Sequence, residues 1–193
     1  MALRIGILGA GNVGGALGRV WAAKGHQITF GKRGGSNAEA ASGAEVVVLS
    51  VPWPAAQEAV KSAGDLAGKI LIDCTNPLSP DLKGLAVGLT TSAAEQVAAW
   101  APGAKVVKAF NTIGAVNFGN AKFGADLADG FYCGDDSAAK GVVKGLVTDA
   151  GMNPVDVGPL RNARMLEPLA MLWIDLALNQ KQGTDHAFKL LRR

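Results

Sequence analysis

The chain has 193 residues, of which 49% are hydrophobic, so a single domain with its own core is expected. Its net charge of +3 at pH 7 is too small and too scattered to indicate nucleic-acid binding. No apolar run reaches the length of a membrane span, and Cys74 and Cys133 lack metal or redox spacing. These features predict a cytoplasmic protein with free thiols and no metal site, whose partners include neither nucleic acid nor membrane.

Strand and helix patterns alternate along the chain, which favours an α/β fold with parallel strands. The predicted strands span residues 3–8, 27–30, 45–50, 69–73, 105–109, 131–133 and 154–157. Helices are expected between the first two strands and over residues 37–41, 55–62, 93–100 and 137–150. Unbroken apolar runs such as VVVLS and KILID are typical of strands covered on both faces. The sequence therefore predicts a Rossmann-type open parallel sheet with helices on both faces.

The interval between the second and third predicted strands is short. Only fourteen residues separate Phe30 from Glu45, too few for a helix, a strand and another connection. We infer that the usual third strand is missing and that strand 45–50 pairs directly with the first strand.

The C-terminal part of the chain carries a long apolar pattern over residues 159–178, with Pro159 suited to a first helical position. We therefore expect one domain, with a dinucleotide-binding core over residues 1–158 and a short C-terminal helical extension over residues 159–193. The closing segment AFKLLRR fits either a short strand or a helical turn.

The segment GAGNVG places Gly9, Gly11 and Gly14 in a G-x-G-x-x-G pattern between the first strand and a helix starting at Asn12. In this context Gly9 permits a tight turn, and Gly11 lets a pyrophosphate approach the backbone. Gly14 lets the helix pack closely on the strand, and the helix N-terminus faces the phosphates. A glycine-rich turn that binds no ligand is the alternative.

Lys32 and Arg33 follow the second strand, where an acidic residue that binds the ribose hydroxyls of NAD usually stands. No Asp or Glu precedes Glu39 in the chain. Arginine offers a phosphate group a planar fork of donors and lysine offers a point charge, so the pair predicts NADP(H) as the cofactor. The alternative is that both are solvated loop charges.

Three further loops, SVPWP, DCTNP and AFNTIGA, leave the carboxyl ends of predicted strands, where open α/β sheets bind ligands. Trp53, in the first loop, is either part of the core or a wall on which a ligand stacks. His26 and His186 fit structural or solvated roles, and no acid–base cluster is evident. We therefore assign no catalytic residue.

The segments GILGAGNVGGALG, GKR, VLSVPW, IDCTNPL, VVKAFNTIGA and VDVGPLRNARMLEPLAMLWI occur in this order. Together they resemble the NADPH-dependent reductases of the deazaflavin coenzyme F420, and they are similar also to the cytosolic oxidoreductase domain of the six-transmembrane epithelial metalloreductases. The resemblance implies that NADP(H) lies across the strand ends with a flat tricyclic acceptor against its nicotinamide. It places Ala10, Gly11, Asn12 and Val13 at the pyrophosphate, Lys32 and Arg33 at the 2′-phosphate, Val51, Pro52 and Asn76 along the ribose and nicotinamide, and Ile113, Gly114 and Ala115 near the carboxamide.

Hydride transfer to a deazaflavin or flavin needs alignment more than a protein proton donor, so the absence of an acid–base cluster fits such an acceptor. We expect an NADP(H)-dependent oxidoreductase that transfers hydride between NADPH and coenzyme F420. A flavin serving ferric or quinone reduction is the alternative acceptor, and an NADP-binding redox sensor is the non-enzyme alternative.

The C-terminal helix reads as apolar on more than one face, since Met165, Met171 and Leu172 widen a stripe that includes Trp173. Such a helix either roofs the acceptor pocket or packs on a second subunit. We expect both, in a homodimer whose helix pair borders the site. Arg161 and Arg164, near the helix start, fit either contact with an acidic acceptor tail or a solvated helix face.

The cofactor assignment predicts the effect of Arg33→Ala. A charge-assisted hydrogen bond contributes about 1.5–3 kcal/mol, so NADPH affinity should fall roughly ten- to a hundredfold while NADH affinity stays almost unchanged. Titration of both cofactors measures this, and an equal loss for the two would contradict the 2′-phosphate assignment.

Overall fold

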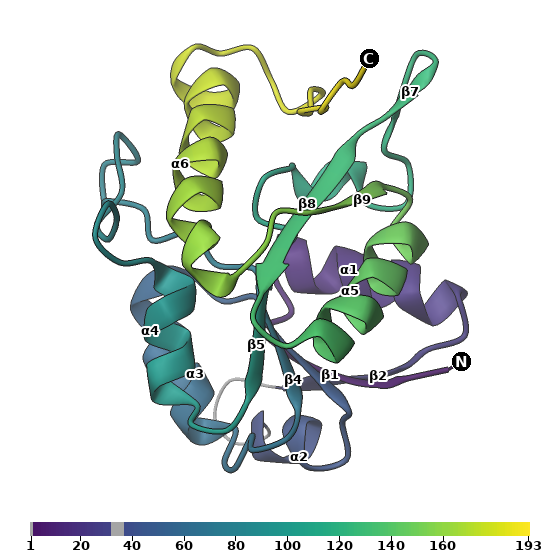
Figure 1. Cartoon of the computed structure of the whole chain (residues 1–193), viewed down its shortest axis with the longest axis vertical. Helices are drawn as coiled ribbons and strands as arrows, with labels where there is room; N and C mark the ends of the chain where they lie inside the picture. Colours follow the sequence, from purple (N-terminus) through teal and green to yellow (C-terminus); the bar gives the residue numbers. More distant parts are fainter. Residues whose placement is uncertain (1, 32–36) are drawn as a thin grey trace.

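The computed structural model describes residues 2–31 and 37–193, which form a twisted sheet with helices on both faces (Figure 1). The sheet has seven strands in the order β2-β1-β3-β4-β5-β8-β9. These strands are β1 (Arg4–Leu8), β2 (Gln27–Gly31), β3 (Val46–Leu49), β4 (Ile70–Asp73), β5 (Lys105–Ala109), β8 (Asp129–Gly134) and β9 (Asn153–Asp156). A separate hairpin pairs β6 (Lys122–Phe123) with β7 (Asp126–Leu127). The predicted fold class is confirmed.

The helices are α1 (Asn12–Ala23), α2 (Asn37–Ser42), α3 (Ala56–Ser62), α4 (Ala93–Trp100), α5 (Ser137–Asp149) and α6 (Ala163–Ile174), with a π-helical turn η4 (Asp175–Asn179) after α6. Short 3-10 turns are η1 (Trp53–Ala55), η2 (Ala115–Asn117) and η3 (Leu160–Asn162). Most boundaries lie within one or two residues of the predicted ranges.

Side-chain alternation along the strands divides the interior into two cores. Ile5 and Ile7 of β1 point into a core that includes Leu17 and Trp21 of α1 and Leu146 of α5. The opposite face of the sheet packs against α2, α3, α4 and the start of α6. Because β3, β4 and β5 contribute apolar side chains to both cores, these strands read as continuous apolar runs.

The sheet ends at β2, as the short interval predicted. Strand β3 pairs directly with β1 in parallel, and within the described ranges no strand lies beyond β2. Helix α2 has six residues and packs against β1, where a Cβ at Gly6 would overlap the carbonyl oxygen of Ala40. A glycine at this position therefore lets the short helix lie directly on the strand.

The expectation of parallel pairing throughout is wrong for one pair of neighbouring strands. Strand β8 runs antiparallel to β5, and β9 then runs parallel to β8. Residues 110–128 contain only η2 and the β6–β7 hairpin, without a helix. A parallel return needs a crossover that is usually helical, so this segment returns the chain in the opposite direction.

The C-terminal segment also differs from prediction at its start. Pro159 precedes the 3-10 turn η3, and α6 begins only at Ala163, so Pro159 does not occupy the first position of the helix. Residues 180–193 form neither a strand nor a helix. They are nevertheless attached to the sheet, since Phe188 accepts a backbone hydrogen bond from Asp129, whose carboxylate accepts one from Leu190.

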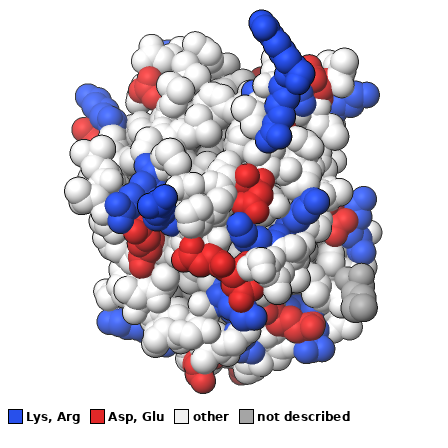
Figure 2. All heavy atoms as spheres, viewed as in Figure 1, with Lys and Arg blue, Asp and Glu red and all other residues white. Residues whose placement is uncertain are grey.

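The surface seen in Figure 2 carries Lys and Arg side chains interspersed with Asp and Glu. This face has no broad basic area of the kind that binds nucleic acid. Among the described residues, no helix combines the length and the apolar character that crossing a bilayer requires.

Candidate functional site

A cleft of about 1030 Å³ lies at the carboxyl ends of β1, β2 and β3. Its lining comes from the β1–α1 turn (Gly9, Ala10, Gly11), the end of β2 (Phe30, Gly31), the start of α2 (Asn37), the loop after β3 (Ser50, Val51, Pro52) and the end of η1 with α3 (Ala55, Glu58, Ala59, Ser62). Cofactor sites usually have volumes of about 300–1,000 Å³, so this open cleft is large enough for a dinucleotide.

The three motif glycines have the geometry that the sequence predicted for them. Gly9 has φ of +104°, which favours glycine in the turn. A Cβ at Gly14 would overlap the carbonyl oxygen of Gly9, so α1 lies directly against the turn. At Gly11, by contrast, a Cβ would find no atom of the described residues within 4 Å. The backbone at Gly11 is therefore open to the cleft.

The N-terminus of α1 is available to an anion. Its N-cap is Gly11, no side chain caps it, and its first turn holds no acidic residue. The free N–H groups and the positive end of the helix dipole meet the cleft at this point. Ser50 fixes the adjacent loop to the turn, because its hydroxyl donates to the carbonyl oxygens of Leu8 at 3.2 Å and Gly9 at 2.9 Å.

Lys32 and Arg33 lie outside the described residues. The residues on either side of this segment, Gly31 and Asn37, both line the cleft. Asn37 donates to the hydroxyl of Ser62 on α3 at 2.9 Å, which joins the two walls of the cleft. The described residues that flank the segment therefore belong to the cleft that contains the glycine turn.

The predicted site residues fall into two groups. Gly9, Ala10, Gly11, Val51 and Pro52 line the cleft, and Asn12, Val13 and Gly14 continue from it into α1. Asn76, Ile113, Gly114 and Ala115 do not line the cleft and follow the carboxyl ends of β4 and β5. The second group belongs to the same edge of the sheet, further along the strand order.

Asn76 is held by Asn111, a residue that sequence reasoning did not single out. Its amide donates to the Asn111 carbonyl oxygen at 3.0 Å, and the Asn111 amide donates back to Asn76 Oδ1 at 3.1 Å. Phe110 precedes this pair with φ of +64°, a sparsely populated conformation for a bulky residue and one that clusters at functional sites. A Cβ at Gly114 would meet the ring of Trp173 at 2.7 Å, so α6 packs directly on this loop.

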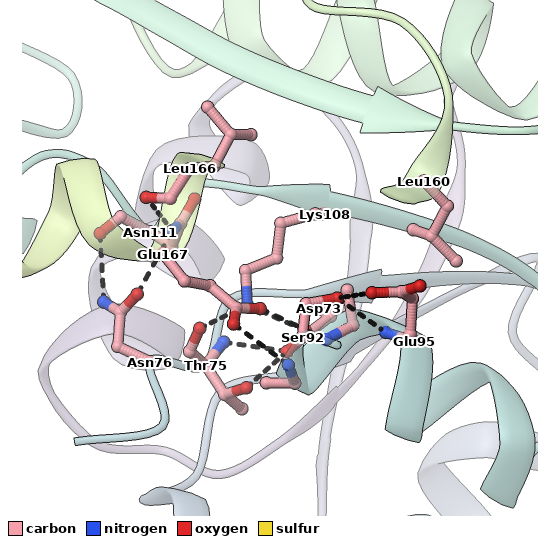
Figure 3. Close-up of polar contacts among 12 residues, drawn as sticks. Asp73, Thr75, Asn76, Ser92, Glu95, Lys108, Asn111, Leu160, Leu166 and Glu167 are labelled. Carbon is pink, nitrogen blue, oxygen red and sulfur yellow. Dashed lines mark hydrogen bonds and ion pairs between the residues drawn. The ribbon is translucent and has the colours of Figure 1, made fainter. Parts of the chain in front are cut away.

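A buried ion cluster lies beneath the second group, contrary to the expectation that no cluster of acid and base groups is present. Lys108 Nζ lies 2.9 Å from Asp73 Oδ2 and 3.0 Å from Glu167 Oε1, and all three residues are 0% exposed. Figure 3 shows Lys108 between the two carboxylates, with Thr75 beside it. We call Asp73, Lys108 and Glu167 the buried triad.

The hydrogen bonds of the buried triad are saturated. The three N–H groups of Lys108 reach Asp73, Glu167 and the carbonyl oxygen of Thr75. Glu167 also accepts from the backbone N–H groups of Ala93 at 2.9 Å and Ala94 at 3.2 Å, which caps α4. The triad therefore connects β4, β5, α4 and α6, and it lies outside the lining of the cleft.

Burial by itself would lower the pKa of Lys108, but the Asp73 and Glu167 carboxylates outweigh this effect and raise it. Burial raises the pKa of Glu167, and the charge of Lys108 opposes that rise. Since Lys108 and Glu167 have every donor or acceptor engaged and no exposed surface, neither is placed to exchange a proton with a ligand.

His26, His186 and Trp53 contact other residues of the chain and do not line the cleft. His26 accepts from the Leu3 N–H at 3.1 Å and contacts Asp149 at 3.2 Å, whereas His186 stacks on Trp173. Trp53 stacks on Trp100 with ring centroids 5.3 Å apart and does not line the cleft, which favours its core interpretation.

Cys74 and Cys133 are buried free thiols, as predicted. Burial raises the pKa of Cys133 to about 12, so this thiol is protonated at neutral pH. Arg164 pairs with Glu95 of α4 at 2.6 Å, so it joins α6 to α4 and is not a free cation.

Comparison with known proteins gives the relationship of the chain. Residues 30–77 match the family described as NADP oxidoreductase coenzyme F420-dependent. The F420-dependent NADP reductase of Methanothermobacter marburgensis is 34% identical over 157 residues, covering 77% of this chain and 70% of that protein. The chain belongs to the F420-dependent NADP oxidoreductase family. The resemblance found in the sequence is thereby confirmed.

Other similar proteins include one that is much longer than this chain and one of matching extent. Metalloreductase STEAP3 of Rattus norvegicus is 31% identical over 191 residues, but the chain spans only 37% of that protein. A crystal structure of a proposed F420-dependent NADP reductase from Arthrobacter sp. FB24 matches with a TM-score of 0.91 and 31% identity, over 99% of this chain and 100% of that chain. A reductive aminase from Aspergillus terreus in complex with NADPH, 18% identical with a TM-score of 0.67, shares the fold.

The cleft fits the dinucleotide that the family description implies. The open space at Gly11 is where a phosphate group can approach the backbone, and the uncapped start of α1 offers N–H donors to it. We therefore treat the cleft and the loops after β4 and β5 as one candidate cofactor site.

The open space predicts that Gly11→Val leaves the fold intact and weakens cofactor binding. Gly11 has φ of −73° in an extended conformation, which valine can adopt. The branched side chain would occupy the approach of the pyrophosphate, and overpacking of this kind costs about 1–3 kcal/mol, or roughly five- to 150-fold in NADPH affinity.

Gly43→Val is the matched control, because a Cβ there also meets no described atom within 4 Å and Gly43 does not line the cleft. Circular dichroism and NADPH titration of both variants measure the effect. Near-normal affinity of Gly11→Val, or an equal loss in Gly43→Val, would show that the turn is not the phosphate site.

Proposed function

We propose that this chain binds NADP(H) across the carboxyl ends of its parallel strands and transfers hydride between NADPH and a planar acceptor, coenzyme F420 being the first choice. The observation that carries the proposal is the open backbone at Gly11 in front of an uncapped helix N-terminus, within a cleft of about 1030 Å³. Membership of the F420-dependent NADP oxidoreductase family supports the choice of cofactor and acceptor.

The residues of the chain have separate tasks in this proposal. The N–H groups from Ala10 to Val13 bind the pyrophosphate, with Gly9 and Gly14 shaping the turn. Lys32 and Arg33 bind the 2′-phosphate. Val51 and Pro52 border the ribose in the middle of the site. Asn76 and the loop of Ile113, Gly114 and Ala115 orient the nicotinamide.

The bound cofactor supplies a hydride from its reduced nicotinamide ring, so the protein has to align the two rings and exclude water. The acceptor gains that hydride and one proton from solvent, and oxidised NADP⁺ is the other product. The saturated buried triad is consistent with such a reaction, because none of its groups reaches the cleft as a proton donor.

A flavin is the second candidate acceptor. It is favoured by the 31% identity with the rat metalloreductase STEAP3, over 89% of this chain. In that case the chain would serve ferric or quinone reduction through the flavin. A cytoplasmic location suits either acceptor.

The acceptor is identified by mixing the protein with NADPH and, in turn, F420, FMN and FAD, and following the near-ultraviolet absorbance of NADPH. We expect NADPH oxidation with F420 that depends on the protein. Oxidation with FMN or FAD alone would favour the flavin reaction. NADPH binding without oxidation by any of the three would contradict the enzyme proposal and favour a redox sensor.

We also propose a homodimer formed through the exposed face of α6 and η4. Met165 and Leu172 of α6 are 60% and 49% exposed and lie seven residues apart, about two turns along one side of the helix, and Leu178 of η4 is 52% exposed. Trp173, which the sequence pattern placed on the same stripe, is only 8% exposed and packs against Gly114 and His186 of its own chain. A substitution at Trp173 would therefore disturb the fold and not only the dimer.

The dimer proposal predicts that Leu172→Glu is folded and monomeric. Light scattering should give twice 19.7 kDa for the native protein and 19.7 kDa for the variant. Leu127→Glu is the control, since Leu127 is 44% exposed on the β6–β7 hairpin and should leave the mass unchanged. A native mass of one chain would contradict the proposal.

A further inference from the structure

The buried triad carries an uncompensated negative charge. Every carboxyl oxygen of Asp73 and Glu167 accepts from a donor, and hydrogen bonds of this kind favour the charged form of a carboxyl group. Asp73 accepts from the N–H and hydroxyl of Thr75 at 2.8 and 2.7 Å and from Lys108 at 2.9 Å. Glu167 accepts from Ala93, Ala94 and Lys108. In this arrangement two carboxylates face one ammonium.

The surroundings offset this charge only in part. The N-terminus of α4 points its free N–H groups at Glu167 and contributes about half a positive charge. Glu95 and Arg164 lie nearby as an ion pair that is neutral as a whole. Cys74 and Cys133 remain thiols, since burial raises the pKa of each. The interior at the ends of β4 and β5 is therefore net negative.

This charge lies next to the residues assigned to the nicotinamide. Thr75, whose carbonyl oxygen binds Lys108, is followed directly by Asn76. Asn111, the partner of Asn76, donates to the carbonyl oxygen of Leu166, the residue before Glu167 (Figure 3). Because all three triad side chains are fully buried, their field is screened little by water and acts on neighbouring groups.

We propose that the net negative charge of the buried triad favours the oxidised nicotinamide over the reduced one, and so biases the bound cofactor towards hydride donation. The oxidised ring carries a positive charge and the reduced ring carries none, so a fixed negative charge stabilises only the former. The inference rests on the proposed function, since it requires the nicotinamide to lie at the loops after β4 and β5. Asp73, Lys108 and Glu167 would then act on the nicotinamide through their net charge and would not contact the reacting atoms.

The test is the ratio of two dissociation constants, for NADP⁺ and for NADPH, measured by titration on the same preparation without any acceptor. A structural change that weakens the binding of NADP⁺ and NADPH equally leaves this ratio unchanged. Glu167→Gln changes the net charge of the triad from −1 to 0. Glu167→Asp disturbs the contacts of the triad at the same position but keeps the charge at −1. A triple variant, Asp73→Asn with Lys108→Met and Glu167→Gln, brings the charge to 0 with no buried ion.

We expect the ratio of the NADP⁺ dissociation constant to the NADPH dissociation constant to depend on the net charge of the triad. It should rise about three- to tenfold in Glu167→Gln and in the triple variant, and stay near the native value in Glu167→Asp. The triple variant contains no unpaired buried ion, so its comparison with the native protein stands even where a single variant does not fold.

A native ratio in the triple variant would overturn the inference, as would an equal rise in Glu167→Asp and Glu167→Gln. Either result leaves the proposed function intact, since both constants are still measured. Failure of the native protein to bind either form of NADP would instead refute the proposed function.

Discussion

One buried ammonium group fixes the geometry on which the candidate site depends. Lys108 extends from β5 into the interior, where it is fully buried, and requires acceptors for all three of its N–H groups. They come from the end of β4 and from α6, and one of those acceptors also caps α4. Removing one partner of such a cluster typically costs about 3–5 kcal/mol, because the remaining charge is left unpaired. Four elements distant in sequence are thus held in one arrangement.

The two halves of the site are built by different means. The phosphate half depends on local backbone geometry, in which a turn at Gly9 and close packing at Gly14 leave Gly11 open. The nicotinamide half depends on long-range contacts, because Asn76 is oriented by Asn111, which is itself bonded to α6 at Leu166. Damage to α6 would therefore affect the second half first.

The sequence predicts the strands closely because each buried parallel strand is a continuous apolar run, such as the one in Val46–Leu49. The short interval between Phe30 and Glu45 also predicts that, in the described ranges, no strand lies beyond β2. The direction of β8 is not, since it depends on whether residues 110–128 form a crossover helix, and their sequence carries no decisive pattern. The partners of Asp73 are also not predictable from the sequence, because they depend on how distant elements pack together.

The members of the buried triad are scattered over β4, β5 and α6, so no local motif connects them. A signal was nevertheless present. Lys108 interrupts the apolar segment KVVKAF, in a strand predicted to be covered on both faces, and a charge in that place must find a counter-charge. Which acidic residues supply it depends on the packing of α6, which pattern alone does not determine. The glycine turn, in contrast, is readable because its geometry is encoded in six consecutive residues.

We propose that one NADP(H) molecule spans both halves of the site. Amide hydrogen exchange, measured with and without NADPH, tests this position of the cofactor. Cofactor binding should slow the exchange of amide hydrogens at the turn of Gly9 to Val13, and also at the loops that contain Asn76 and Ile113 to Ala115. Amide exchange in β9, the edge strand at the opposite end of the sheet from β2, should be unchanged. Protection confined to the glycine turn, or absent from both regions, would contradict the proposed position of the cofactor.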